Sequence, residues 1–202
     1  DDTVSYNKGK VLDYEALEKI DTFGRYLDSD NDGICYRTYP GTHPEKGAYF
    51  TRGTSHDEYA RYTEDGNINA QTLTRLMRKF RTATDLVPEP IIEINGEDSC
   101  GVIYYGSSKP AVLEAKDILK TKNINLDLMQ IRSFPFNLDV WEFIANHDRI
   151  YVVEQNRDSQ MRTLIMAEGG ISAEILRPLV HFTGDPIDCL LYTSDAADDD
   201  VR

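Results

Sequence analysis

Apolar positions follow two different patterns in the two halves of this 202-residue chain. In the first half the only regular spacing is helical. One helix is predicted within residues 8–23, with Asp13 as its N-cap, and a second is predicted over residues 67–86. The apolar residues assigned to one stripe of the second helix are Ile68, Leu73, Leu76, Met77 and Phe80.

The second half alternates compact apolar runs with helical segments. The runs predict strands over residues 100–105, 124–131, 149–153 and 176–182. Between them, helices are predicted over residues 109–120, 138–145 and 159–168. Strands and helices that alternate with short connections predict an α/β fold with a mostly parallel sheet and helices on its faces.

Residues 24–66 show neither pattern for long, yet they are rich in Arg, Asp, Tyr and Gly. A stretch that buries little and carries much polar chemistry is typical of a functional or interface loop. Pro88 and Pro90 end the helix that follows it. We therefore predict an irregular, loop-rich segment with flanking helices over residues 1–90 and an α/β domain over residues 91–188.

The net charge of −13 argues against nucleic acid or an anionic membrane as the main partner, because both would repel the chain. No apolar run approaches the length of a membrane span. The three cysteines form no Cys-x-x-Cys pair, so the sequence encodes neither a structural zinc site nor an iron–sulfur cluster. So few cysteines suit a reducing compartment, and we expect a cytoplasmic protein.

Both ends of the chain carry unusual signals. The first residue is not Met, so we expect the chain to begin inside a longer reading frame or a processed product. Residues 189–198 read CLLYTSDAAD, which resembles the translation of an adapter used to prepare sequencing libraries. We expect residues 189–202 to be non-native; a short natural acidic tail is the alternative.

The segment Asp28-Ser-Asp-Asn-Asp-Gly33 matches the first half of a calcium-binding loop. Asp28, Asp30 and Asp32 occupy its first three ligand positions, and glycine follows at the sixth. The twelfth position is Tyr39, where a bidentate glutamate is expected. The segment is therefore a candidate cation site, and an Asx-type turn is the alternative.

Three further groups are candidate site residues. Gly106, Ser107 and Ser108 join a strand to a helix and could cradle an anion, but the glycine and serines are more typical of a tight strand–helix turn. Glu154 and Asn156 follow a parallel strand, where open α/β sheets bind ligands or partner subunits. His56, beside two carboxylates, is the histidine with the clearest polar neighbours.

Residues 8–188 resemble the α subunit of 2-oxoacid:ferredoxin oxidoreductases, especially of the 2-oxoglutarate type. The resemblance rests on the run Arg37-Thr-Tyr-Pro-Gly41 and on Gly53-Thr-Ser-His-Asp-Glu58. Further similar elements are Gly106-Ser107, Phe134-Pro-Phe136, Glu154-Gln-Asn156 followed by Gln160, and Gly184-Asp-Pro-Ile187. The resemblance implies a transketolase C-terminal-like domain, preceded by the end of a thiamine-pyrimidine-type domain.

The resemblance also implies a function. Such enzymes use thiamine diphosphate with magnesium and an iron–sulfur cluster to convert a 2-oxoacid to acyl-coenzyme A, and they pass electrons to ferredoxin. The Tyr-Pro-Ile-Thr-Pro motif of the α subunit and the Gly-Asp-Gly…Asn element of the β subunit are absent here. We therefore expect a fragment that is not catalytic alone and that meets the β subunit, with Arg37 and His56 positioning the interface.

Two other functions remain open at the level of sequence. The first is a free-standing, calcium-stabilised interaction module built on Asp28, Asp30 and Asp32. The second is a transketolase-type enzyme that does not use ferredoxin.

Overall fold

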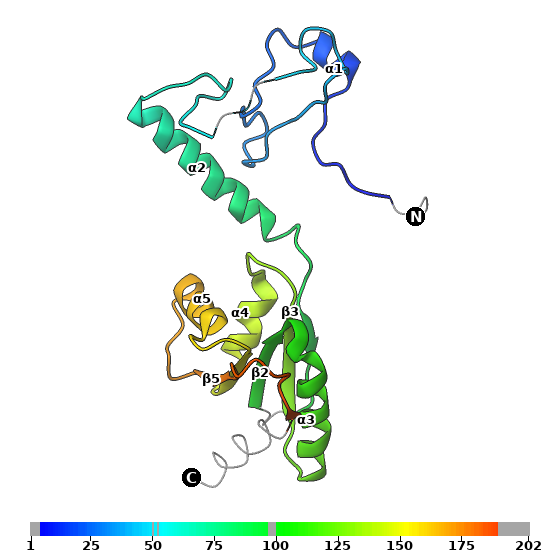
Figure 1. The fold of residues 1–202 in the computed structure, drawn as a ribbon, viewed down its shortest axis with the longest axis vertical. Coiled ribbons are helices and arrows are strands. Elements are labelled where there is room, and N and C mark those ends of the chain that lie inside the picture. Colours follow the sequence, from blue (N-terminus) through cyan, green and yellow to red (C-terminus); the bar gives the residue numbers. More distant parts are fainter. Residues whose placement is uncertain (1–4, 50, 52, 97–99, 190–202) are drawn as a thin grey trace. The chain divides into compact units, whose positions relative to one another are not determined.

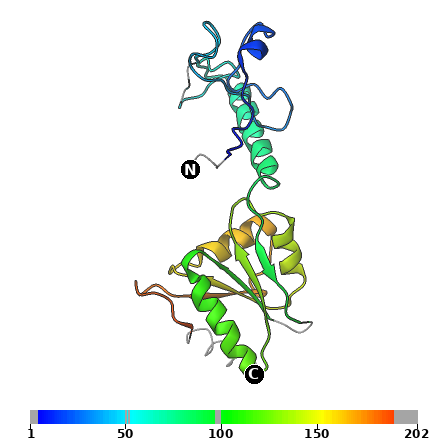
Figure 2. The ribbon, with the colours of Figure 1, turned by 90° about the vertical axis from the view of Figure 1, so that its right-hand side faces the viewer.

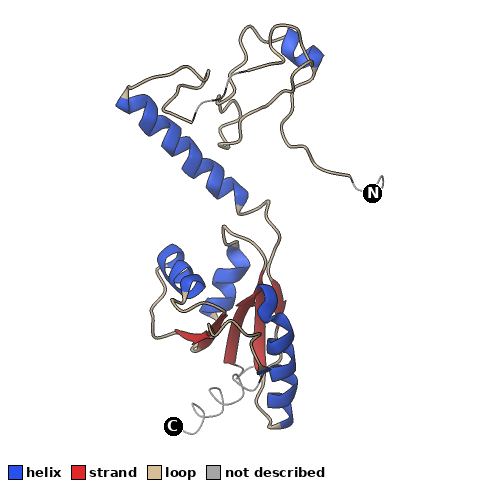
Figure 3. Cartoon of the chain, in the orientation of Figure 1, coloured by secondary structure: helices blue, strands red, loops and turns tan. Residues whose placement is uncertain are grey.

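The computed structural model describes residues 5–49, 51, 53–96 and 100–189. Contacts between residues divide the chain into two compact units, Asp1–Leu86 and Val87–Arg202, which we call the N-terminal unit and the C-terminal unit. Each is described by itself below. Figure 1 traces the chain through both units, and Figure 3 shows that the strands gather in the C-terminal unit.

The C-terminal unit is built on a five-stranded sheet with the strand order β1-β3-β2-β4-β5. Its strands are β1 (Ile91–Glu93), β2 (Cys100–Tyr105), β3 (Leu126–Ile131), β4 (Ile150–Glu154) and β5 (Leu176–Val180). Strands β2 to β5 pair in parallel, and β1 lies antiparallel to β3 at one edge. The predicted α/β fold with a mostly parallel sheet is confirmed.

Helices cover both faces of this sheet (Figures 1 and 2). Helix α3 (Lys109–Thr121) follows the short 3-10 turn η1 (Gly106–Ser108) and packs on one face. Helices α4 (Leu138–Ala145) and α5 (Gln160–Gly169) pack on the other face. The sheet is thus the middle of three layers, which is why its central strands are apolar on both sides.

The alternation of side chains along β2 places neighbouring residues in different cores. Val102 lies in register with Leu128 and belongs to the cluster on the α3 side. Ile103 lies in register with Met129 and Val152 and belongs to the cluster on the α4–α5 side. Each fully buried side chain of this size contributes about 1.5–3 kcal/mol of transfer free energy.

The N-terminal unit has two helices, α1 (Tyr14–Glu18) and α2 (Gly66–Ala83), joined by irregular chain. Asp13 caps α1 as predicted, accepting a hydrogen bond from the Ala16 amide at 2.9 Å. The helix predicted within residues 8–23 is reduced to these five residues. The cause is a tertiary contact: the Arg37 amide donates to the Lys10 carbonyl, and the Leu12 amide donates to Arg37, so the chain before α1 is extended.

Polar contacts hold this irregular chain in place. The Lys46 ammonium donates to the carbonyls of Leu17 and Ile20 at 2.9 and 2.6 Å, just where α1 ends. The ring of His43 lies 2.7 Å from the Glu18 carboxylate. Within the described part of the unit, only Leu17 and Ala60 are fully buried apolar residues. The unit therefore depends far more on hydrogen bonds than on a hydrophobic core.

Candidate functional site

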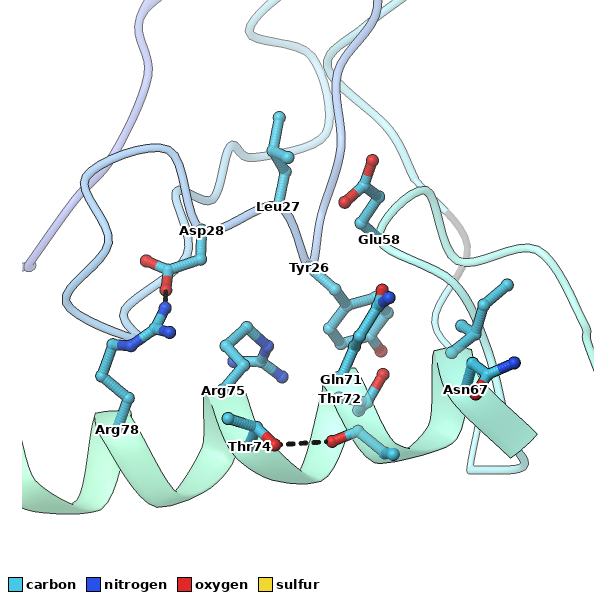
Figure 4. A pocket seen from close by; sticks show the side chains of 12 residues that line it. Tyr26, Leu27, Asp28, Glu58, Asn67, Gln71, Thr72, Thr74, Arg75 and Arg78 are labelled. Atoms are coloured by element: carbon cyan, nitrogen blue, oxygen red, sulfur yellow. Dashed lines mark hydrogen bonds and ion pairs between the residues drawn. The ribbon is translucent and has the colours of Figure 1, made fainter. Parts of the chain in front are cut away.

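A cavity of about 530 Å³ lies between α2 and the loops that precede it, within the N-terminal unit. Asn67, Gln71 and Arg75 line it from α2, and Tyr26 and Glu58 line it from the loops (Figure 4). The three helical residues are spaced four apart, so they share one face of the helix. The cavity offers amide and guanidinium donors opposite a carboxylate, which suits a polar ligand or a polar segment of another chain.

The loop wall of the cavity is held by main-chain and ring contacts. The Tyr26 amide donates to the Glu58 carbonyl at 2.9 Å. The Tyr26 ring stacks on the ring of His56, with centroids 3.9 Å apart and planes 16° apart. The ring of His56 is also 3.0 Å from the Asp57 carbonyl oxygen. These contacts are compatible with the predicted positioning role of His56.

The turn Asp28–Gly33 packs directly on α2. Both Asp28 carboxylate oxygens accept from the Gly33 amide, at 2.9 and 3.0 Å, and one also pairs with Arg78 at 2.7 Å. Gly33 has φ +81°, and a Cβ atom there would lie 2.2 Å from the Lys79 amide nitrogen. Only glycine therefore allows this approach to the helix backbone.

The other two aspartates of the predicted calcium loop are held elsewhere. Lys10 lies 2.6 Å from Asp30 and 2.7 Å from Asp32. The Lys10 hydrogen bond holds the pKa of both carboxyls below the ordinary value of 3.8. Burial lowers the pKa of Lys10, but the hydrogen bonds to the two aspartates outweigh it and raise that pKa overall.

The structure thus separates the carboxylates that the sequence predicted to converge. Asp28 faces α2, whereas Asp30 and Asp32 share a lysine, and Asp32 also accepts from the Ile34 amide at 2.9 Å, the spacing of an Asx-type turn. Among residues 5–49, 51, 53–96 and 100–189, no three His, Cys, Asp or Glu side chains are grouped to hold a metal ion.

Arg37 lies away from the cavity lining and is engaged by its own unit. Its guanidinium donates to the Lys8 carbonyl and lies over the Tyr39 ring, 5.6 Å from the centroid. Its backbone forms the isolated parallel bridge to Val11. Arg37 therefore joins the chain before α1 to the irregular stretch of residues 24–66, and the structure does not bring it together with His56.

The candidate anion cradle and the residues after β4 meet at the carboxyl edge of the sheet. Strands β2 and β4 are adjacent, and the connections that leave β2 and enter β4 run on opposite faces. The Gln155 amide donates to the hydroxyls of Ser107 and Ser108 at 3.0 and 3.2 Å. The two serines are therefore bound to the end of β4 by an amide that lies 48 and 47 residues further along the chain.

Glu154 and Asn156 serve α5 and not an open site. Glu154 is fully buried, and its two oxygens accept from the amides of Met161 and Arg162 at 2.7 and 2.9 Å. Asn156 donates to Glu154 at 2.7 Å. Ser159, just before α5, makes no capping bond. The buried carboxylate therefore replaces the usual N-cap.

Three side chains make contacts that the sequence could not predict. Lys10, Arg78 and Gln155 each lie 20 to 50 residues from the groups that they bind. Spacing along the chain carries no information on such pairs. One usable signal is the group of basic residues at positions 75–81 of the second helix, because arginines there need acidic or carbonyl partners.

Comparison with known proteins agrees with the resemblance seen in the sequence. The α subunit of 2-oxoacid:ferredoxin oxidoreductase 2 from Aeropyrum pernix is 27% identical over 190 residues, which cover 91% of this chain. The corresponding α subunit from Saccharolobus solfataricus is 28% identical over 191 residues, covering 92%. No family model matches the chain.

The fold matches a solved structure of the same kind. The 2-oxoglutarate:ferredoxin oxidoreductase of Magnetococcus marinus, solved with 2-oxoglutarate, coenzyme A and succinyl-CoA bound, has a TM-score of 0.79 over 94% of this chain, at 21% identity. The chain spans 28% and 29% of the length of the two curated relatives, and 32% of the solved chain. The match therefore covers less than a third of each of these longer chains. None of the helices described here is long and apolar enough to cross a membrane.

Proposed function

We propose that this chain is part of the α subunit of a thiamine diphosphate-dependent 2-oxoacid:ferredoxin oxidoreductase. The enzyme would oxidatively decarboxylate a 2-oxoacid such as 2-oxoglutarate to acyl-CoA and pass the electrons to ferredoxin. The observation that carries the proposal is the match to α subunits over more than nine-tenths of the chain. The motifs at Arg37–Gly41 and Gly53–Glu58 support it independently of the fold.

Within that enzyme, this part acts as a scaffold and an interface and is not catalytic alone. The candidate polar residues support this role, because they are engaged in contacts that fix the chain. Arg37 and His56 hold loops, and Glu154 caps a helix. Thiamine diphosphate, magnesium and the iron–sulfur cluster would then be held mainly outside this part, with the β subunit as the partner.

Reconstitution tests the proposal. The complete reading frame that contains this chain would be expressed with its β subunit, and ferredoxin reduction would be measured with 2-oxoglutarate and coenzyme A. We expect reduction that depends on the 2-oxoacid, on coenzyme A and on thiamine diphosphate. The 202-residue chain alone should give none. If the complex assembles but none of the 2-oxoacids tested supports ferredoxin reduction, the proposed activity is contradicted.

Two substitutions separate an interface role from a chemical one. Arg37→Ala and His56→Ala should lower the yield of assembled complex, because each removes a contact that shapes the loops. The turnover of each purified complex should stay within about twofold of the parent, since neither residue would touch the reacting atoms. A loss of about 100-fold in turnover with normal assembly would instead assign chemistry to that residue.

A further inference from the structure

The histidine rings of this chain differ in what their nitrogen atoms contact. At His56, His147 and His181, a ring nitrogen lies 3.0, 2.7 and 3.2 Å from a main-chain carbonyl oxygen. A carbonyl oxygen only accepts hydrogen bonds, so each of these nitrogens carries a proton, and a charged ring keeps the contact. The ring of His43 is arranged in the opposite way.

The Nδ1 atom of His43 faces two hydrogen-bond donors. It accepts from the main-chain amides of Glu45 at 3.1 Å and of Lys46 at 3.0 Å. An amide N–H can only donate, so this nitrogen holds a lone pair and no proton. The proton of the neutral ring is therefore on Nε2, which donates to the Glu18 carboxylate at 2.7 Å. The main chain thus selects one neutral tautomer of His43.

The ring joins two segments of the N-terminal unit. Residues 43–47, which we call the His43 turn, are closed by the Gly47 amide, which donates to the His43 carbonyl at 3.0 Å. From α1, the Tyr14 ring stacks on the His43 ring with centroids 5.2 Å apart, and Glu18 accepts from Nε2. His43 is only 6% exposed, so these contacts are shielded from water.

The charged groups around the ring offer no acceptor to a second proton. Glu18 already accepts from Nε2, and this hydrogen bond lowers the pKa of its carboxyl below the ordinary 4.5. The Lys46 ammonium donates to the carbonyls of Leu17 and Ile20, and the Glu45 side chain is exposed. A proton on Nδ1 would therefore face two N–H groups.

Two opposing effects decide what a second proton does to this arrangement. A positive ring would attract the Glu18 carboxylate, but that side chain is 55% exposed, and ion pairs in contact with water contribute little. Against this, the amides of Glu45 and Lys46 would lose their acceptor, and donors that are shielded from water without a partner are costly. The second effect is the larger, so protonation of Nδ1 requires the His43 turn to open.

We propose that His43 is a pH-dependent latch between the His43 turn and α1. The neutral ring holds the latch closed, and uptake of a proton at Nδ1 opens it. A histidine in contact with water titrates at about pH 6.5, so the latch is closed above that pH and is released as the pH falls below it. The latch depends on contacts within the N-terminal unit and not on the proposed reaction, so loss of ferredoxin reduction would leave it untouched.

Nitrogen-15 NMR of the histidine rings tests the tautomer in the 202-residue chain. At about pH 7.5, the His43 ring should carry its proton on Nε2 and none on Nδ1. His43→Asn assigns the signal by removing it. A proton on Nδ1 of His43 at this pH would overturn the proposal.

Hydrogen exchange of the main-chain amides tests the release. The protection factors of Glu45, Lys46 and Gly47 should fall about tenfold between about pH 7.5 and about pH 5.5, because the open turn lets the ring take up its proton. The Gly33 amide, which Asp28 binds in the same unit, is the reference and should keep its protection factor. Unchanged protection in the His43 turn, or an equal fall at Gly33, would refute the latch.

Two asparagine variants separate His43 from other titrating groups. In His43→Asn, the side-chain oxygen can accept from both amides as Nδ1 does, but it takes up no proton, so the turn should be equally protected at both pH values. His181→Asn removes a histidine of the C-terminal unit and should behave like the parent. If His43→Asn keeps the tenfold fall, another group opens the turn and the proposal fails. If that variant opens the turn at both pH values, the tautomer and the exchange of the parent chain decide.

Discussion

The two units of this chain are stabilised by different means. The C-terminal unit buries two apolar clusters, one on each face of its sheet. The N-terminal unit buries almost no apolar side chains among the residues described and instead ties its loops to α2 through Arg75, Arg78 and Thr82. The comparison shows that a unit can be compact without a hydrophobic core. Side chains of one helix can hold the surrounding loops by donating hydrogen bonds to them.

The two units should differ most in the unfolding free energy that each loses when a leucine is replaced by alanine. Leu128 is 1% exposed and Leu76 is 43% exposed. Leu128→Ala should cost about 2–5 kcal/mol of unfolding free energy, because it leaves a cavity under α3. Leu76→Ala should cost under about 0.5 kcal/mol. Urea unfolding followed by circular dichroism would compare them, and equal costs would refute the contrast between the units.

A large effect is also expected from the buried carboxylate of the C-terminal unit. Glu154→Gln keeps the size of the side chain but replaces one accepting oxygen by an NH₂ group that faces an N–H donor, so it should cost about 1–3 kcal/mol. Trp141, the single tryptophan of the chain, packs near α5 against Gly169 and reports this unit alone. An unchanged urea midpoint of its fluorescence would show that Glu154 does not act as the cap.

In the N-terminal unit, the contact of Gly33 with α2 should matter more than its backbone angle. Gly33→Ala forces a Cβ against the Lys79 amide, and we expect a loss of about 1–3 kcal/mol as the turn leaves the helix. Gly41 is the matched control, since its φ is +87° but open space surrounds the position of a Cβ.

Limited trypsin digestion would measure that difference. Cleavage at Arg25 and Arg37 should be at least several-fold faster in Gly33→Ala than in Gly41→Ala, while Trp141 unfolding stays unchanged. Similar rates in the two variants would show that backbone strain, and not the close approach to α2, decides the stability of the turn.

The smallest effect should come from Lys10→Met. The pKa values of Asp30 and Asp32 are lowered in the folded state, so the stability that they contribute is complete above about pH 4 and is lost as the pH falls through the folded values. The parent should therefore lose N-terminal stability more steeply in acid than Lys10→Met does. Parallel curves in a thermal-melt series from about pH 5 to pH 2 would contradict this.

Calcium provides a second test of the same lysine. Lys10 already compensates Asp30 and Asp32, and Arg78 already compensates Asp28. We expect millimolar calcium to leave the melting temperature of the parent unchanged. A clear rise in that temperature would restore the calcium-stabilised module as a function of this chain.

The sequence predicted the C-terminal unit well because one physical effect dominates there. Continuous apolar runs such as Cys100–Tyr105 can only be buried on both faces, and the observed β2 has those same limits. Strand β1 was missed, because three residues after a proline carry no period. A buried strand is formed by consecutive apolar residues, so the local sequence pattern is enough to predict it.

In the N-terminal unit, local sequence patterns did not predict which polar groups contact one another. Half of a calcium motif was visible at Asp28–Gly33, but its acidic groups are satisfied by Lys10 and Arg78, which lie far away in the sequence. Ile68 was predicted to share one apolar stripe of the second helix with Leu73 and Leu76, whereas it lines the cavity. Contacts between polar groups depend on tertiary geometry, and the spacing of residues does not encode them.

The scarcity of buried apolar surface in the N-terminal unit also determines how temperature acts on it. The heat capacity of unfolding rises with the apolar area that unfolding exposes, and it bends the stability curve downward at both ends. The C-terminal unit should therefore have a curved profile and weaken on cooling. The N-terminal unit should have a nearly straight profile, because its enthalpy and entropy of unfolding change little with temperature, so its stability should keep rising as it is cooled.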